Sequence, residues 1–180
     1  QAHTAVILRL EGVTPQGADV WIDSLLDALQ TLVARAPKNA GLQRDLAACQ
    51  LLKGDVVGAT DPEAGRKLWD KGLARLQHLI ASDHENTQLH VDLAHVYRRL
   101  ELYDLDRRPT ASREWAEEQV RTWELLVELG PENSLFLGGL AQAYEGMGQQ
   151  VKLQNPAKAV PWFTKGMTIR TRLAQTGFDI

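Results

Sequence analysis

The fold class is decided by residues 133–144, which read Asn-Ser-Leu-Phe-Leu-Gly-Gly-Leu-Ala-Gln-Ala-Tyr. Two earlier segments are similar to this stretch, because Asn39, Asn86 and Asn133 follow one another at intervals of 47 residues. A Leu–Ala pair keeps the same interval, at Leu46-Ala47, Leu93-Ala94 and Leu140-Ala141. A fixed period in this range is typical of stacked repeats. The sequence therefore predicts a repeat architecture.

Apolar residues recur at steps of three and four along most of the chain, which is the pattern of amphipathic helices. In residues 18–36, for example, Trp21, Leu25, Leu29 and Leu32 are expected on one apolar face. Proline, glycine and asparagine separate these runs, and Asn39 suits the cap of the helix after it. We expect an all-α chain of about seven main helices, at residues 18–36, 40–53, 63–81, 87–100, 112–129, 135–147 and 156–176.

These helices alternate between a shorter one that follows an asparagine and a longer one that contains a tryptophan. Glycine is expected to end the shorter helices at Gly54 and Gly148, and Pro15 and Gly17 are expected to form a turn. Loops are therefore predicted at 55–61, 101–110 and 148–155. Helical hairpins of this kind bury their faces by stacking, so we expect an α-solenoid of antiparallel hairpins.

The predicted organisation is one repeat domain over residues 18–177, with a lead-in over 1–17 and a tail over 178–180. Its units are expected at 18–36 (a half unit), 40–82, 87–129 and 134–176. Residues 1–12 fit a strand or the end of a helix, and we favour the helix. The chain begins with Gln1 rather than Met, which indicates a processed chain or part of a larger protein.

Composition narrows the function classes. The 180 residues are 44% apolar and 24% charged, with a net charge of −3. We expect no nucleic-acid partner, because such partners are bound mainly through a basic surface. No apolar run approaches the roughly 20 residues that cross a bilayer, so we expect no membrane span in this segment.

The helix motifs resemble those of the tetratricopeptide repeat (TPR) family. Leu93-Ala94 followed by Tyr97, and Leu140-Ala141 followed by Tyr144, are similar to the first-helix motif of that family. Pro131-Glu132-Asn133 is similar to the turn that closes its repeat. This chain departs from the family in its period, 47 residues against about 34. It also has Gln50 where the first copy would carry the aromatic residue.

The resemblance covers about residues 18–177 and implies a right-handed superhelix. Residues 37–46 are also similar to long-period TPR units of bacterial multidomain proteins, including signalling kinases. The resemblance thus implies a scaffold or regulatory domain of a larger bacterial protein, for which a cytoplasmic location is favoured. Two alternatives stay open: a structural or self-association segment, and a small-molecule sensor with an aromatic-lined pocket.

In the TPR family, the first helices of successive repeats line a concave groove that binds a peptide or partner protein. By position, the resemblance implies these partner-binding candidates: Arg44, Gln88, His95, Arg98, Arg99, Gln142 and Glu145. The cationic candidates would receive an acidic peptide or a terminal carboxylate. The alternative for Arg98 and Arg99 is a structural role at the negative end of their helix.

We expect no enzyme activity, no cofactor and no metal site in this chain. Cys49 lies in an apolar run, which is typical of a small buried hydrophobic residue. His90 and His95 are five residues apart, so they point away from each other on a helix. Asp92 and His95 share a face, but two ligands alone make a weak metal site.

Overall fold

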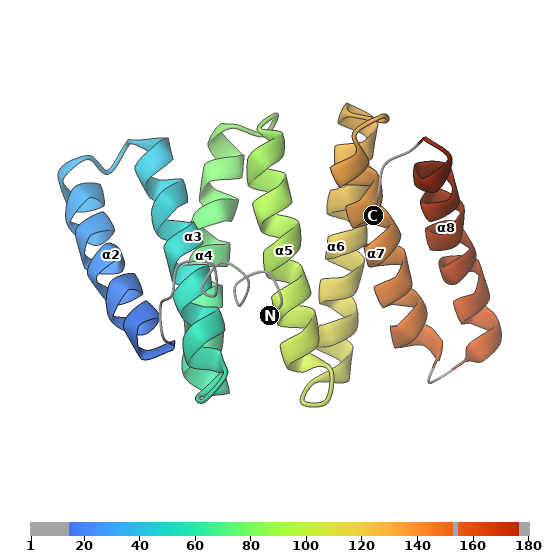
Figure 1. Cartoon of the computed structure of the whole chain (residues 1–180), viewed down its shortest axis with the longest axis horizontal. Coiled ribbons are helices and arrows are strands. Elements are labelled where there is room, and N and C mark those ends of the chain that lie inside the picture. Colours follow the sequence, from blue (N-terminus) through green and yellow to red (C-terminus); the bar gives the residue numbers. More distant parts are fainter. Residues whose placement is uncertain (1–14, 153–154, 177–180) are drawn as a thin grey trace. The chain divides into compact units, whose positions relative to one another are not determined.

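The computed structural model describes residues 15–152 and 155–176. Seven α-helices and no strand occupy these residues (Figure 1). The helices are α2 (Pro15–Arg35), α3 (Ala40–Gly58), α4 (Pro62–Ser82), α5 (Thr87–Asp104), α6 (Pro109–Leu129), α7 (Ser134–Lys152) and α8 (Pro156–Gln175). The all-α fold class is therefore confirmed. The expectation for residues 1–12 lies outside the described residues.

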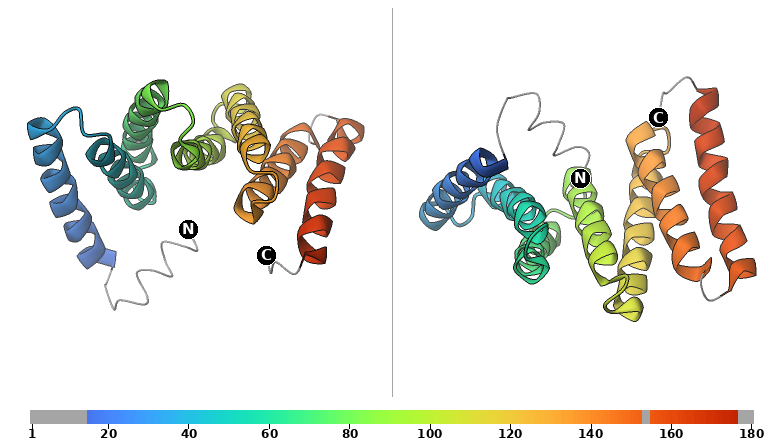
Figure 2. Two further views of the ribbon diagram at one scale, coloured as in Figure 1. Left: turned by 90° about the horizontal axis from the view of Figure 1, so that it is seen from above. Right: turned by 60° about the horizontal axis from the view of Figure 1, so that its bottom comes forward.

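The chain forms two compact units that separate after His84. In the first unit, α3 packs against α2 and α4. In the second unit, α6 packs against α5 and α7, and α8 packs against α7. Within each unit, successive helices run in opposite directions and are joined by short turns (Figures 1 and 2). Antiparallel hairpins are thus the building block, as the sequence predicts.

Asparagine residues start several of these helices by accepting hydrogen bonds from free backbone N–H groups. The Asn39 side chain accepts from Leu42 N at 3.1 Å, and the Asn86 side chain accepts from Leu89 N at 3.4 Å. Asn133 accepts from Leu135 N at 3.0 Å. Each such cap contributes about 1 kcal/mol to helix stability. The periodic asparagines therefore mark the helix starts.

Helices α3, α5 and α7 are longer than the sequence pattern predicted. The predicted loops 55–61, 101–110 and 148–155 are mostly helical, since these helices run on to Gly58, Asp104 and Lys152. The predicted turn at Pro15 and Gly17 is also wrong, because both residues belong to α2. The difference between shorter and longer helices therefore nearly disappears.

Close packing explains why the two glycines do not end their helices. A Cβ atom at Gly54 would lie 2.6 Å from the Trp69 indole, and one at Gly148 would lie 2.8 Å from the Phe163 ring. Each glycine thus lets an aromatic side chain approach the helix backbone. Sequence alone does not separate this use of glycine from a helix end.

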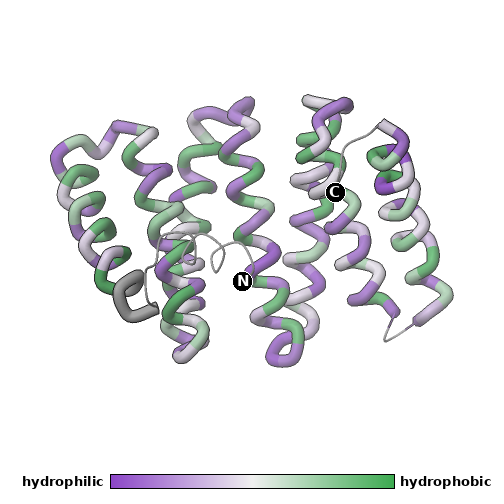
Figure 3. Tube along the Cα trace, viewed as in Figure 1, coloured by the Kyte–Doolittle hydropathy of each residue, from purple (hydrophilic) through white to green (hydrophobic). Residues whose placement is uncertain are grey.

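Apolar residues recur in short blocks along every described helix (Figure 3). In the first unit, Ile22, Leu29, Leu46 and Cys49 form a buried cluster between α2 and α3. Cys49 is only 4% exposed, which confirms its predicted burial. Trp21 and Leu32 differ from the prediction, because they remain 61% and 44% exposed.

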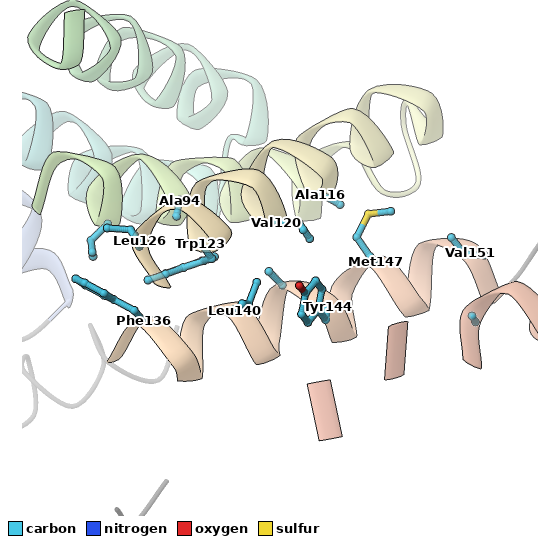
Figure 4. Close-up of a cluster of buried hydrophobic side chains, with 13 residues drawn as sticks. Ala94, Ala116, Val120, Trp123, Leu126, Phe136, Leu140, Tyr144, Met147 and Val151 are labelled. Carbon is cyan, nitrogen blue, oxygen red and sulfur yellow. The ribbon is translucent and has the colours of Figure 1, made fainter. Parts of the chain in front are cut away.

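The core of the second unit lies between α6 and α7, with contributions from α5 and α8 (Figure 4). Trp123 of α6 lies over Gly139 of α7, where an added Cβ would come within 2.5 Å of the indole. Phe136, Leu140 and Met147 complete the α7 side of this cluster. Leu140 and Ala141 of the Leu–Ala motif are buried, so the motif serves helix packing.

Candidate partner-binding surface

Side chains of α5 and α7 meet in the second unit. Gln150 of α7 donates through Nε2 to Glu101 Oε1 of α5 at 3.3 Å. The same Nε2 donates to Ser112 Oγ of α6 at 2.8 Å. One turn earlier on α7, a Cβ atom at Gly146 would lie 3.3 Å from an Nη atom of Arg98. These contacts bring Arg98 of α5 close to Gly146 of α7, and the exposed His95 and Gln142 stand one turn earlier on α5 and α7. We call these four residues the α5/α7 surface.

Arg98 balances a buried carboxylate at the centre of this surface. Its Nη1 donates to Glu101 Oε2 at 2.6 Å. The Glu101 side chain is 3% exposed, whereas the Arg98 side chain is 30% exposed. A buried carboxylate is costly without a partner, so part of the Arg98 charge is needed inside the protein. The guanidinium carries five N–H donors, of which Glu101 uses one at Nη1.

His95 is exposed on the surface of α5, but its ring lies against α6. The ring centroid is 5.8 Å from that of Trp123, in an edge-on arrangement. Loss of hydration beside the indole lowers the pKa of His95, and the nearby Arg99 charge lowers it further, while Asp92 opposes both. The imidazole is therefore neutral at pH 7, since its ordinary pKa is already about 6.5.

Glu145 belongs to the edge of the α5/α7 surface, where α7 meets α8. Arg170 of α8 donates to it from Nε at 2.5 Å and from Nη2 at 3.0 Å. This two-pronged pairing holds the carboxylate and raises the pKa of Arg170 above its ordinary value. Gln142, one turn earlier on α7, is exposed.

The other three predicted candidates make contacts within α5 or belong to the first unit. Gln88 donates to Asp92 Oδ1 at 3.1 Å on the same helix. Arg99 donates from Nη1 to the backbone oxygen of His95 at 3.2 Å, inside α5 rather than at its end. Arg44 lies on α3 of the first unit, whereas the other candidates belong to the second unit. Of the seven candidates, Arg98 lies close to α7 and Glu145 pairs with Arg170 of α8, while His95 and Gln142 are exposed on α5 and α7.

Sequence reasoning missed the buried polar residues behind this surface. The sequence pattern predicts a loop at Glu101 and Asp104, yet both residues are buried in α5. Asp104 accepts from Arg108 Nε and from Trp115 Nε1, both at 2.9 Å. One available signal was the 47-residue spacing, because Glu101 stands midway between Gly54 and Gly148. A glutamate at a position that is glycine in the other two copies indicates that the helices of this hairpin pack differently there.

Two features of the described residues bear on metal binding and on thiol chemistry. Within residues 15–152 and 155–176, no group of three or more His, Cys, Asp or Glu residues is placed to hold a metal ion. Burial raises the pKa of the Cys49 thiol, so the reactive thiolate is disfavoured. None of the helices in these ranges is long and apolar enough to cross a membrane.

No family model and no curated protein matches the chain. Two solved structures are similar to it at low sequence identity. The "Crystal structure of MamA protein" aligns with 96% of this chain and 91% of its own, at 14% identity and a TM-score of 0.42. A second structure, "MamA MSR-1 C2", aligns with 86% of this chain and 98% of its own, at 17% identity and a TM-score of 0.22. Likeness at these TM-scores carries no argument about function.

Proposed function

We propose that this chain is a TPR-like protein-interaction domain, acting as a scaffold or regulatory module, whose α5/α7 surface binds a peptide or partner domain. The observation that carries the proposal is the Gln150–Glu101 contact with the adjacent approach of Arg98 to Gly146. These internal contacts fix the partly exposed Arg98 side chain of α5 close to α7. The long-period resemblance to bacterial signalling proteins supports the same role.

Arg98 gives this surface its chemical preference. One Nη group is bound to Glu101, and the side chain keeps 30% of its area exposed. A guanidinium has five N–H donors, so Arg98 can receive a second carboxylate from a partner. His95 is neutral and Glu145 is paired with Arg170, so neither adds a free positive charge. A terminal carboxylate or one acidic side chain therefore fits better than a long acidic segment.

A panel of fluorescein-labelled peptides with a free C-terminal carboxylate tests this function by fluorescence anisotropy, with amidated versions of each peptide alongside. We expect binders among the free-carboxylate peptides and at least tenfold weaker binding after amidation. Gln142→Glu should weaken binding, because it places a negative charge on the surface that is to receive a carboxylate. Gln77→Glu, which changes an exposed residue of α4, is the matched control and should bind normally.

The double variant Arg98→Gln with Glu101→Gln isolates the charge. It removes the cation and the buried carboxylate together, so no unpaired charge remains inside the protein. We expect this variant to keep its helical circular dichroism and to lose the preference for a free carboxylate. If no peptide binds, or if Gln142→Glu and Gln77→Glu behave alike, the α5/α7 surface is not the binding site.

A further inference from the structure

Two aromatic rings at the contact of α7 and α8 hold a cation. Tyr144 of α7 belongs to the core cluster of the second unit (Figure 4), and Trp162 of α8 packs against that cluster. The centroids of the two rings are 5.8 Å apart, and the ring planes are tilted by 45°. The Lys165 ammonium lies 5.0 Å from the centroid of each ring. Both rings therefore attract the same positive charge.

This hold on Lys165 is weak. Lys165 is an exposed residue, and no carboxylate of the described residues forms an ion pair with its ammonium. A cation–π contact at an exposed site contributes little, and the four-carbon stem of lysine is flexible. The ammonium can therefore leave the two rings and be replaced by another cation.

A carboxylate beside the same rings has no cation of its own. Glu124 of α6 is half-buried and accepts a hydrogen bond from the Tyr144 hydroxyl at 2.8 Å. Among the residues that the structure describes, no basic group forms an ion pair with Glu124. Burial raises the pKa of Tyr144, and the Glu124 hydrogen bond raises it further, so the hydroxyl stays protonated and keeps donating. A partly desolvated carboxylate favours a positive partner, and Lys165 does not supply one.

The aromatic pair 47 residues earlier, Tyr97 with Trp115, has different surroundings. Its rings stack at 20°, and the Trp115 indole N–H donates to Asp104 at 2.9 Å. Glu118 stands at the position of the lysine, and Gln77 stands at the position of the carboxylate. The charges of the α7/α8 site are thus not repeated in this copy, so the packing of the hairpins does not require them.

A guanidinium satisfies both parts of the site. Its planar group stacks on aromatic rings, and its N–H donors match the two oxygens of a carboxylate, whereas an ammonium is a compact point charge. The Lys165 ammonium lies at the rings without pairing with Glu124. We propose that Tyr144, Trp162 and Glu124 bind an arginine side chain of a partner, and we call these residues the arginine site. Lys165 occupies the two rings until that side chain replaces it.

An NMR titration of the full chain, labelled with ¹⁵N, tests this proposal. The probe is N-acetyl-arginine amide, whose guanidinium is its only charged group, added at constant ionic strength. We expect the indole N–H signal of Trp162 to shift and to saturate, and Trp162→Phe identifies this signal by its loss. N-acetyl-lysine amide should bind at least threefold more weakly, because its ammonium lacks the paired donors of a guanidinium.

Two variants separate the roles of the charges. Glu124→Gln keeps an acceptor for the Tyr144 hydroxyl and removes the negative charge, so the arginine probe should bind at least fivefold more weakly. Lys165→Ala frees the rings, so the probe should bind at least threefold more tightly. The matched controls are Glu128→Gln on α6 and Lys158→Ala on α8, which change exposed residues and should bind like the unchanged chain.

Three outcomes overturn the proposal, once circular dichroism has shown that the variants keep their helices. The first is a Trp162 signal that does not saturate with the arginine probe. The second is equal binding by Glu124→Gln and Glu128→Gln, because the carboxylate then takes no part. The third is equal binding by Lys165→Ala and Lys158→Ala, because the lysine then does not occupy the site.

Discussion

The two helices of hairpin α3/α4 and the two helices of hairpin α5/α6 contact each other in different ways. In α3/α4, a Cβ atom at Gly65 would lie 2.8 Å from the backbone oxygen of Gly54, so only glycine fits. The residue 47 positions later is Ser112, whose hydroxyl donates to the backbone oxygen of Glu101 at 2.9 Å. One hairpin thus brings the backbones together, and the other holds them apart with a hydrogen bond.

A second position repeats this contrast. A Cβ at Gly72 would lie 3.4 Å from the backbone oxygen of Ala47. The residue 47 positions later is Gln119, which donates from Nε2 to the backbone oxygen of Ala94 at 3.5 Å. Hairpin α7/α8 follows the glycine solution, because a Cβ at Gly166 would lie 3.0 Å from Ala141 O.

The difference has a functional consequence. Glycine contacts leave no side chain to reach a third helix, whereas Ser112 and Glu101 both contact Gln150 of α7. The polar hairpin is therefore the one that anchors the α5/α7 surface. We infer that the glycine hairpins are the more sensitive to added volume and the polar hairpin is the more sensitive to lost hydrogen bonds.

The largest effect should come from added volume in the glycine hairpin. Gly65→Val would place its Cβ atom 2.5 Å from Gly58 Cα, and a contact with backbone cannot be relieved by turning a side chain. Overpacking of this kind lowers the free energy of unfolding by about 3 kcal/mol. Urea denaturation of the full chain, followed by circular dichroism, measures the loss.

Gly138→Ala is the matched control for Gly65→Val. A Cβ at Gly138 meets no atom within 4 Å, so alanine should raise stability by up to about 1 kcal/mol through helix propensity. If Gly65→Val is also neutral or stabilising, then the close backbone contact does not limit the residue at position 65.

The next effect should come from the buried ion pair of the polar hairpin. Arg98→Met leaves the Glu101 carboxylate buried with only the Gln150 amide as a side-chain partner. The expected loss is about 2 kcal/mol, below the full cost of a broken buried pair, because the Arg98 side chain is partly exposed. Thermal and urea unfolding measure it. Adding Glu101→Gln should restore most of the stability, and a double variant as unstable as the single one would argue against an uncompensated charge.

The sequence predicts the features that depend on neighbouring residues and misses those that depend on contacts between helices. The asparagine caps and the burial of Cys49 depend on nearby residues, so periodicity and capping rules identify them. Gly54 depends on Trp69, which lies fifteen positions away along the chain. The local sequence reads as a helix end because the aromatic partner belongs to another helix.

The candidate surface divides in the same way. The TPR-like motif predicted that α5 and α7 would carry the exposed residues, and it named Arg98 and Gln142. The Arg98–Glu101 ion pair matters because the Glu101 side chain is buried. The sequence pattern does not predict that burial, so it does not predict the pair. The assignment of these residues to partner binding stays a prediction for the peptide experiments.

A smaller effect should follow from one hydroxyl of the polar hairpin. Ser112→Ala makes this position like that of α7/α8, where the residue 47 positions later is Ala159. The variant leaves the Glu101 carbonyl and the Gln150 amide each with one hydrogen bond fewer, which should lower stability by about 1 kcal/mol. Ala159→Ser, urea-denatured in parallel, shows whether a serine is equally tolerated in a hairpin without these partners. Unchanged stability in Ser112→Ala would mean that α5/α6 does not depend on its polar contacts.

The smallest effect is the pH dependence of stability that comes from His95. The polar hairpin has an imidazole at this position, whereas α3 has Ala48 at the equivalent position 47 residues earlier. The pKa of His95 is lowered first by burial against α6 and then by Arg99, so proton uptake is weaker in the folded state. The unfolded chain binds this proton near pH 6.5, and stability therefore falls as the pH drops below that value.

Histidine ring signals in an NMR titration should show the His95 midpoint below 6.5. Arg99→Gln should raise this midpoint because a positive charge is removed, and Asp92→Asn should lower it because a negative charge is removed. Shifts of the same sign in both variants would mean that a change in burial, rather than charge, sets the pKa of His95.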